Sequence, residues 1–203
     1  MRVALFGGTF DPPHRGHLAI ATAAADAFHL DEVLFAPAGR QPLKPDGTSA
    51  PFCDRVAMLS LACLPDTRFA VSTLDAPHAD GTPNYTVQTL TALHQLLPHD
   101  TLFNLVGADS FLDLPHWRDP IQLLELAEWI VVSRPGRSLD NLSTLNLTPD
   151  QQTRVHLLQT VHEDVAASDL RLRLEAGDAC PNLLPAAVSQ YIQAHHLYQH
   201  PGD

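Results

Sequence analysis

The chain has 203 residues, 45% of them hydrophobic and 17% charged, and its formal net charge at pH 7 is −11. This composition is typical of a protein that buries a core, and the length favours one domain spanning residues 1–203. The acidic balance and the single lysine argue against nucleic acid as a partner, because binding a polyanion needs clustered Lys and Arg side chains.

The sequence also lacks the marks of export, membrane insertion and cysteine-based metal binding. No apolar stretch approaches the length of a membrane span, and glycines interrupt the first apolar run after Phe6, so no signal peptide is predicted. We therefore expect a cytoplasmic protein without a membrane partner. The three cysteines, Cys53, Cys63 and Cys180, form neither an even set nor a close pair, which argues against a disulfide scaffold or a thiolate metal site.

Short apolar runs alternate along the chain with segments of helical periodicity. Strands are predicted at Val3–Phe6, Val33–Ala36, Phe69–Val71, Leu102–Val106, Trp129–Val132 and Val155–Val161. Helices are predicted at Gly16–Phe28, Asp54–Cys63, Thr86–Leu97 and Pro185–His196. This alternation predicts an α/β fold, Rossmann-like and doubly wound, with a mostly parallel sheet and helices on both faces. In such sheets ligands bind beyond the carboxyl ends of the strands, where the strand order reverses.

The turn after the first predicted strand has the properties of a phosphate site. Gly7, Gly8, Thr9 and Phe10 lead into it, and Gly16 stands at the start of the helix that follows. Glycines allow the backbone to approach a phosphate closely, and a helix start presents free N–H groups to an anion. The spacing fits neither the P-loop nor the dinucleotide-binding fingerprint, so a P-loop NTPase and an ordinary dehydrogenase lose support.

Two histidines in this turn can take part in phosphate chemistry. His14 and His17 are three residues apart at the helix start, so both imidazoles can donate to one bound phosphate. Transfer at phosphorus needs mainly positioning and stabilisation of charge, which such donors supply. The alternatives are histidines that only cap or pack the helix, and a metal site. A metal site has less support because no third ligand follows at a recognisable spacing.

Residues Gly7 to His17 resemble the signature of the nucleotidylyltransferase superfamily, whose (His/Thr)-x-Gly-His element matches His14-Arg15-Gly16-His17. In that superfamily the second histidine stabilises the α-phosphate, and the resemblance gives this role to His17. Four further segments occur in the order found in nicotinate mononucleotide adenylyltransferases: Asn84 to Leu90, Gly107 to Ser110, Trp117-Arg118 and Ser133 to Gly136. The C-terminal segment Tyr191 to Tyr198 is similar too, so the resemblance covers nearly the whole chain.

The resemblance implies that Tyr85, Thr86 and Trp117 bind nicotinate mononucleotide. Thr86 stands near a predicted helix start, where the N–H groups and the helix dipole favour a carboxylate such as that of nicotinate. Trp117 offers a flat face on which a pyridine ring can stack. The alternatives are an ordinary N-cap for Thr86 and a core position for Trp117. Lys44 follows Pro42-Leu43 where the family usually has Pro-His-Lys, and its charge can meet a substrate phosphate.

The same resemblance places the adenosine of ATP near Gly107, Asp109 and Arg134. Gly107 allows close approach of the backbone after a strand, and Asp109 can accept hydrogen bonds from ribose hydroxyls. Asp109 is alternatively, or in addition, a helix cap. Arg134 follows another strand and can contact the adenosine side of the ligand, with a solvated arginine as the alternative.

A second phosphate motif is predicted in the C-terminal helical part, at about residues 165–203. Val165 to Arg171 resembles the superfamily signature Ile-Ser-Ser-Thr-x-Ile-Arg, which holds the β- and γ-phosphates of ATP. Ser168 is expected to cap the helix and to donate to phosphate, and Arg171 to supply a charge-assisted fork one turn later. Ala166 and Ala167 depart from the signature, which removes two hydroxyl donors and leaves the backbone N–H groups.

These observations predict an enzyme of NAD biosynthesis that joins ATP and nicotinate mononucleotide to give nicotinate adenine dinucleotide and pyrophosphate. His14, His17 and Arg171 are its predicted catalytic residues, and the reaction is an in-line attack at the α-phosphate without a covalent intermediate. Mg²⁺ is expected, held mainly by ATP phosphates and not by a protein metal site. The alternatives are a transferase that uses nicotinamide mononucleotide or phosphopantetheine, a non-catalytic nucleotide-binding module and a structural metal-binding protein. A homo-oligomer is compatible with the sequence.

Overall fold

The computed structural model describes residues 1–42, 47–133, 145–159 and 166–199 and has a six-stranded sheet at its centre. Every pair of neighbouring strands is parallel, and the strand order is β3-β2-β1-β4-β5-β6. The strands are β1 (Arg2–Gly8), β2 (Glu32–Pro37), β3 (Phe69–Val71), β4 (Thr101–Gly107), β5 (Glu128–Ser133) and β6 (Val155–Gln159). The predicted doubly wound fold is confirmed, with a sheet that is parallel throughout.

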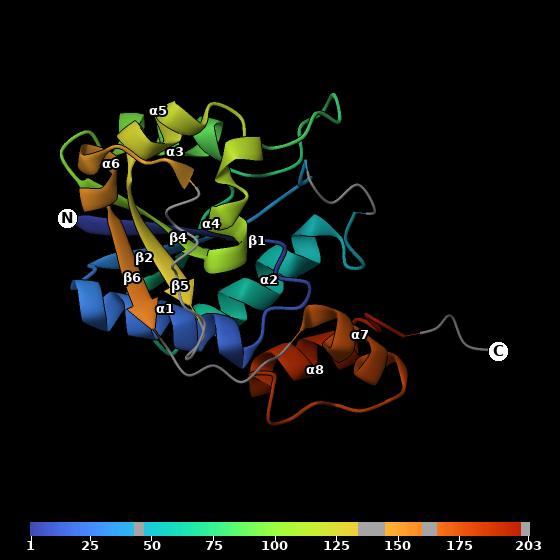
Figure 1. The fold of residues 1–203 in the computed structure, drawn as a ribbon. Helices are drawn as coiled ribbons and strands as arrows, with labels where there is room; N and C mark the ends of the chain where they lie inside the picture. Colours follow the sequence, from blue (N-terminus) through green and yellow to red (C-terminus); the bar gives the residue numbers. More distant parts are fainter. Residues whose placement is uncertain (43–46, 134–144, 160–165, 200–203) are drawn as a thin grey trace.

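Helices cover both faces of this sheet (Figure 1). One face packs against α1 (Arg15–Phe28) and α2 (Phe52–Cys63), and the other against α3 (Thr86–Leu96), α4 (Ala108–Leu112) and α5 (Pro120–Leu126). The remaining helical segments are η1 (Leu114–His116), α6 (Pro149–Thr153), α7 (Ala167–Glu175) and α8 (Ala186–Ala194). Within the described residues, none of these helices is both long enough and apolar enough to cross a membrane.

The central strands β1, β4 and β5 are mostly apolar because both of their faces are buried, whereas the edge strand β6 is partly exposed and includes His156 and Gln159. In β1, Ala4 and Phe6 belong to the core on the α1 side, whereas Val3 and Leu5 belong to the core on the α3 side. Successive side chains of a strand point to opposite faces, so a strand covered on both sides needs an apolar residue at each position. This pattern made the central strands recognisable in the sequence, and a shorter apolar run indicated β6. The last one ends at Gln159, and positions 160 and 161 of the prediction lie outside the described residues.

A third core joins the C-terminal helices to the rest of the molecule. It consists of Met58 and Ala62 on α2, Leu170 and Leu174 on α7, Val188 and Ile192 on α8, and Ala50, Cys180 and Leu184 between helices. Figure 1 shows α7 and α8 packed together beside α2, away from the sheet. The opposite side of α2, with Leu59 and Cys63, contributes to the core beneath the sheet. Helix α2 therefore connects the two parts through packed side chains.

The four predicted helices are confirmed with small shifts at their ends, and four short helical segments lie outside the predicted elements. Helix α2 begins two residues earlier than predicted, at Phe52, and α8 ends two residues earlier, at Ala194. The additional segments are α4, η1, α5 and α6. Their lengths of three to seven residues explain the difference, because two turns or less give too little periodicity to recognise.

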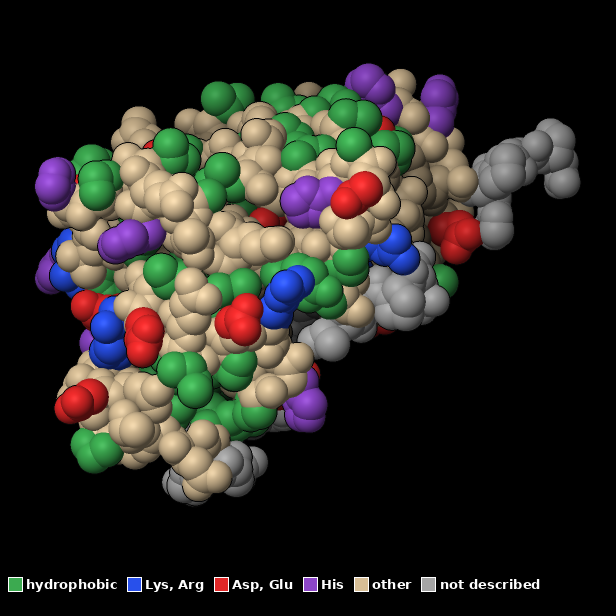
Figure 2. All heavy atoms as spheres, turned by 90° about the horizontal axis from the view of Figure 1, so that it is seen from above, with side chains coloured by type: hydrophobic (Ala, Val, Ile, Leu, Met, Phe, Trp, Pro, Cys, Tyr) green, Lys and Arg blue, Asp and Glu red, His purple; other side chains and the backbone are tan. Residues whose placement is uncertain are grey.

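Charges of both signs are distributed over the surface. Figure 2 shows the molecule from above, and on this face Arg side chains lie among Asp and Glu side chains. Among the residues described on this face, no continuous basic patch forms.

The third core gives a stability test of the predicted single domain. Leu170→Ala removes a side chain that is 1% exposed, and we expect it to lower the free energy of unfolding by about 2–5 kcal/mol. Leu172→Ala, on the same helix but 64% exposed, should change it by less than about 0.5 kcal/mol. Urea unfolding followed by circular dichroism and tryptophan fluorescence would measure both. Two separate transitions in the unaltered protein would contradict a single domain.

Candidate functional site

The candidate site lies where the strand order reverses, between β1 and β4. These two strands are neighbours in the sheet, but the chain continues from β1 to β2 on one side and from β4 to β5 on the other. Gly7 and Gly107 stand at their carboxyl ends, and a Cβ atom added at either glycine would meet no atom within 4 Å. The backbone is thus open to a ligand at the position where a doubly wound sheet binds one.

The side chain of Phe10 packs in the core beneath the loop after β1. Its side chain is 1% exposed and packs edge-on against Phe6 and His17, with ring centroids 5.5 Å and 4.9 Å away. Its backbone is left-handed, with φ at 49°. Phe10 was predicted to bind ATP, but this side chain belongs to the core, so only its backbone remains available to a ligand. Gly8 is confined by the same ring, which would lie 3.1 Å from an added Cβ.

The two predicted histidines lie against each other at the start of α1. Their rings are stacked, with centroids 3.6 Å apart and an interplanar angle of 24°. The backbone N–H of His14 donates to Nδ1 of His17 at 3.2 Å. Because this nitrogen accepts, the proton of a neutral His17 ring must reside on Nε2, which is then a donor. The predicted juxtaposition is therefore present, and His17 has a defined tautomer.

Burial keeps both imidazoles neutral at physiological pH. It lowers the pKa of His14 from 6.5 to about 4, and Nδ1 of His14 is buried without a hydrogen-bond partner. The pKa of His17 is also lowered, first by burial and then by the neighbouring His14. A charged form of either ring would lose hydration without gaining an opposite charge. The pair thus offers neutral N–H donors to a ligand.

Arg171 reaches this loop from the other end of the chain. It is half-buried on α7, and its Nη1 donates to the backbone carbonyl of Asp11 at 2.9 Å. The N–H of Arg15, the first residue of α1, donates to the carbonyl of Leu183 at 2.8 Å. The C-terminal part therefore contacts the first loop at Asp11, before the histidines, and at Arg15, between them. The predicted grouping of Arg171 with the histidine loop is present.

Ser168 differs from its predicted structural role. The N-cap of α7 is Ala166, and no side chain caps this helix. Ser168 lies in the first turn and is exposed, so it is not the cap, although its hydroxyl remains free to face solvent or a phosphate. The N-cap thus lies two residues before Ser168, at the position of the first serine of the family signature. Alanine can occupy a cap position when water or a ligand satisfies the free backbone N–H groups.

Two other cap alternatives are also wrong. Thr86 is the first residue of α3, whose N-cap is Tyr85, and Asp109 lies in the first turn of α4, whose N-cap is Gly107. Both residues therefore stand at helix starts that face the carboxyl edge of the sheet. Lys44 and Arg134 lie outside the described residues.

The residues predicted to bind the pyridine ring, Tyr85, Thr86 and Trp117, lie at the start of α3 and in the turn before α5. The guanidinium of Arg118 lies 4.7 Å from the centroid of the Tyr85 ring, which brings the two predicted segments together. Trp117 is half-buried and contacts Trp129, whose ring centroid is 6.0 Å away. Trp117 is thus neither fully core nor fully exposed, and part of its ring remains available for stacking.

A buried amide fixes the chain just before this segment. Asn84 accepts a hydrogen bond from the N–H of Arg40 at 2.9 Å and donates to the carbonyl of Ala76 at 2.9 Å. A Cβ added to Gly39 would lie 2.4 Å from the backbone nitrogen of Pro77 and 2.8 Å from Oδ1 of Asn84. Only glycine permits this close approach, which holds the segment after β2 against the entry to α3.

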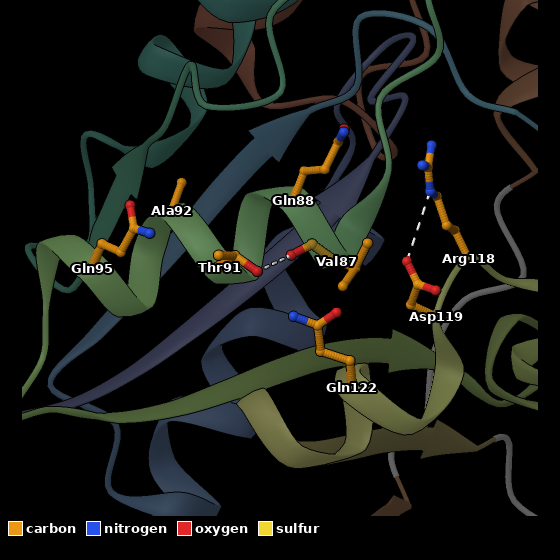
Figure 3. A pocket seen from close by; sticks show the side chains of 8 residues that line it. All are labelled: Val87, Gln88, Thr91, Ala92, Gln95, Arg118, Asp119 and Gln122. Carbon is orange, nitrogen blue, oxygen red and sulfur yellow. Dashed lines mark hydrogen bonds and ion pairs between the residues drawn. The ribbon is translucent and has the colours of Figure 1, made fainter.

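A hollow of about 360 Å³ runs along α3 beside this region (Figure 3). It lies between α3 and α5 and is lined by Val87, Gln88, Thr91, Ala92, Gln95, Arg118, Asp119 and Gln122. Arg118 and Asp119 form an ion pair at one end, with 3.7 Å between Nε and Oδ2. The hollow contains none of the predicted site residues, and Arg118 joins it to Tyr85.

Three residues that hold the first loop were not predicted as functional. Asp11 is 3% exposed and accepts from the N–H groups of Ser49 and Ala50 at 2.6 Å and 3.0 Å. Arg55, 1% exposed, donates to the carbonyls of Thr9 and Ala50. The hydroxyl of Tyr198 donates to Asp11 at 2.6 Å. For Arg55 the sequence did offer a signal, because a charged residue among the apolar positions of the α2 segment indicates a buried charge with partners.

Comparison with known proteins agrees with this geometry. The cytidylyltransferase-like family model matches residues 5–173. Relatives from Roseiflexus sp. (strain RS-1) and Solibacter usitatus (strain Ellin6076), both named probable nicotinate-nucleotide adenylyltransferase, are 41% and 40% identical to this chain. The alignments cover 97% and 98% of this chain, and 98% and 100% of the relatives. The chain belongs to the nicotinate-nucleotide adenylyltransferase family.

Solved structures support the same fold. A nicotinic acid mononucleotide adenylyltransferase from Plasmodium falciparum, complexed with NaAD, superposes with a TM-score of 0.77 at 17% identity and covers 97% of each chain. The structure of that protein complexed with APC gives a TM-score of 0.76. At this identity the likeness concerns the arrangement of helices and strands. This member of the nicotinate-nucleotide adenylyltransferase family therefore shares its fold with a distant solved relative over nearly its full length.

The lowered pKa of His14 predicts a pH dependence of stability. Between pH 6.5 and about 4 the unfolded chain binds a proton at this position and the folded chain does not, so stability falls as the pH drops. His14→Gln should reduce this loss by about 1–3 kcal/mol. Urea unfolding at several pH values between 7.5 and 4.5 would measure it. His99→Gln, at an exposed position, is the control and should follow the unaltered protein. Parallel curves for all three proteins would contradict the prediction.

Proposed function

We propose that this chain joins the phosphate of nicotinate mononucleotide to the adenylyl group of ATP, giving nicotinate adenine dinucleotide and pyrophosphate. One observation supports the proposal most directly: His17 has a neutral Nε2–H donor at the start of α1, because its Nδ1 accepts from the backbone of His14. Family membership supplies the substrates, since the relatives carry the name of this activity.

The reaction is a single in-line displacement at phosphorus. An oxygen of the nicotinate mononucleotide phosphate forms a bond to the α-phosphorus of ATP, and the bond from that phosphorus to the bridging oxygen of the β-phosphate breaks. Pyrophosphate leaves with the electron pair. The attacking phosphate is already ionised at neutral pH, so the enzyme needs no general base and forms no covalent intermediate.

The described residues act by stabilising the negative charge of the phosphates. His14 and His17 donate to α-phosphate oxygens, and Arg171 stabilises the negative charge that develops toward the leaving pyrophosphate. Gly7, Gly8, Thr9, Gly16 and Ser168 face the same phosphates, while Gly107 and Asp109 border the nucleoside. Tyr85, Thr86 and Trp117 receive the pyridine ring, with the start of α3 favouring its carboxylate.

Mg²⁺ is proposed to enter with ATP as part of the substrate. The groups that gather at the site are mostly nitrogen donors, which suit phosphate oxygens better than they suit Mg²⁺, a cation that prefers oxygen ligands. In the described part of the chain, no group of three or more His, Cys, Asp and Glu side chains could hold a metal ion. The ion would thus be held by triphosphate oxygens and water, where it neutralises charge.

The substrate pair gives the first test. We expect pyrophosphate release from MgATP with nicotinate mononucleotide and much less with nicotinamide mononucleotide, with the dinucleotide product identified by mass spectrometry. Release with phosphopantetheine instead would assign the chain to another acceptor. Tight ATP binding without release with any acceptor would identify a non-catalytic nucleotide-binding module.

His17 gives the second test. His17→Ala removes a donor that faces the developing charge, so kcat should fall about 100- to 1,000-fold. His94→Ala, at an exposed position on α3, should retain the activity of the unaltered protein. Circular dichroism would verify folding of both variants. Near-normal turnover by a folded His17→Ala protein would refute the role of His17.

A further inference from the structure

Tyr198 connects the C-terminal segment to the loop that carries the histidines. Its hydroxyl donates to Oδ1 of Asp11 at 2.6 Å across a separation of 187 residues. Its ring is half-buried and packs with Leu197 against the third core, between α2, α7 and α8. Burial and the Asp11 carboxylate both raise the pKa of Tyr198, so the phenol stays protonated and remains a donor.

Two hydrogen bonds join Asp11 to the C-terminal part of the chain. Its side chain accepts from Tyr198, and its backbone carbonyl accepts from Nη1 of Arg171. The two remaining contacts of the carboxylate come from the N–H groups of Ser49 and Ala50. Because the carboxylate is 3% exposed, water cannot readily replace a lost donor. The Tyr198 hydroxyl is thus one of three described donors that hold the side chain of Asp11, the residue whose carbonyl accepts from Arg171.

We propose that Tyr198 is a positioning residue for adenylyl transfer, which acts through Asp11 on Arg171. The hydroxyl holds Asp11 in the orientation that directs the Asp11 carbonyl to the guanidinium, and the guanidinium is thereby placed for the phosphates. Tyr198 does not contact the reacting atoms itself. The inference rests on the proposed function, since it assigns Arg171 to the transition state of that reaction.

The chain contains a matched control for this bond. The hydroxyl of Tyr191 donates to Oδ1 of Asp54 at 2.8 Å, again from the C-terminal segment to a carboxylate. This bond joins α8 to α2 and involves no residue of the first loop. Tyr191→Phe and Tyr198→Phe therefore remove the same hydroxyl from the same kind of pair. Only the second removal acts on Asp11.

Steady-state kinetics on the full chain would compare the two variants. We expect Tyr198→Phe to lower kcat about tenfold, because a small displacement of a group that stabilises the transition state is costly in rate. The KM for nicotinate mononucleotide should stay within about twofold, since the pyridine side is not altered. Tyr191→Phe should keep both constants. Thermal unfolding of the two variants would show whether their losses of stability are similar.

A double substitution tests the route through Arg171. In the Arg171→Ala background the step from Tyr198 to Phe should change kcat by less than about twofold, because the group that it positions is gone. Tyr191→Phe should have no effect in either background. Additive losses for Tyr198→Phe and Arg171→Ala would overturn the proposal.

The other possible results separate a failure of the inference about Tyr198 from a failure of the proposed function. Equal kcat for Tyr198→Phe and the unaltered protein would overturn the inference and leave the proposed function intact. Equal losses for Tyr198→Phe and Tyr191→Phe, or failure of Tyr198→Phe alone to fold, would overturn it too, because the hydroxyl would then serve stability. An unaltered protein that releases no pyrophosphate from ATP and nicotinate mononucleotide would instead refute the proposed function.

Discussion

The candidate site depends on one buried carboxylate, that of Asp11. Removing a charged carboxylate from water is unfavourable unless hydrogen-bond donors replace the water, and here the donors come from Ser49, Ala50 and Tyr198. Arg55 lies close by, and its positive charge is itself buried beneath the loop. The requirement to satisfy this one group brings together segments that the sheet alone would leave apart. The first loop is consequently fixed before any substrate arrives.

The histidine pair illustrates how the fold prepares donors without adding charge. Stacking and burial keep both rings neutral, and the helix start fixes which nitrogen of His17 is free to donate. A neutral donor has a smaller desolvation cost than an imidazolium in the same place, so it can remain within a packed site. The guanidinium of Arg171 is placed beside this loop by a backbone carbonyl that carries no net charge. In the proposed reaction, the negative charge of the substrate would meet these neutral donors and the guanidinium of Arg171.

Most of the fold could be predicted from the sequence, because strands buried on both faces appear as continuous apolar runs and the longer helices have clear periodicity. Helix α5 could have been recognised from Asp119-Pro120, a cap-type residue followed by proline at the first helical position. The histidine loop could be predicted because all of its residues are adjacent in the sequence. The side-chain position of Phe10, the cap of α7 and the contacts of Asp11 could not, because each depends on packing between distant segments. Local pattern indicates which residues carry chemistry, whereas tertiary contacts decide how they are held.

The distance along the chain between Asp11 and its partners also has a consequence during synthesis. The loop with His14 and His17 leaves the ribosome early, but Arg171 and Tyr198 follow 160 and 187 residues after Asp11. Proteins are made from the amino terminus, so the sheet can form while these late partners are still absent. A nascent chain, or one cut short by a premature stop, would contain this loop without the hydrogen bonds from Arg171 and Tyr198 to Asp11. The hydrogen bonds that hold Asp11 are therefore complete only after synthesis has passed residue 198.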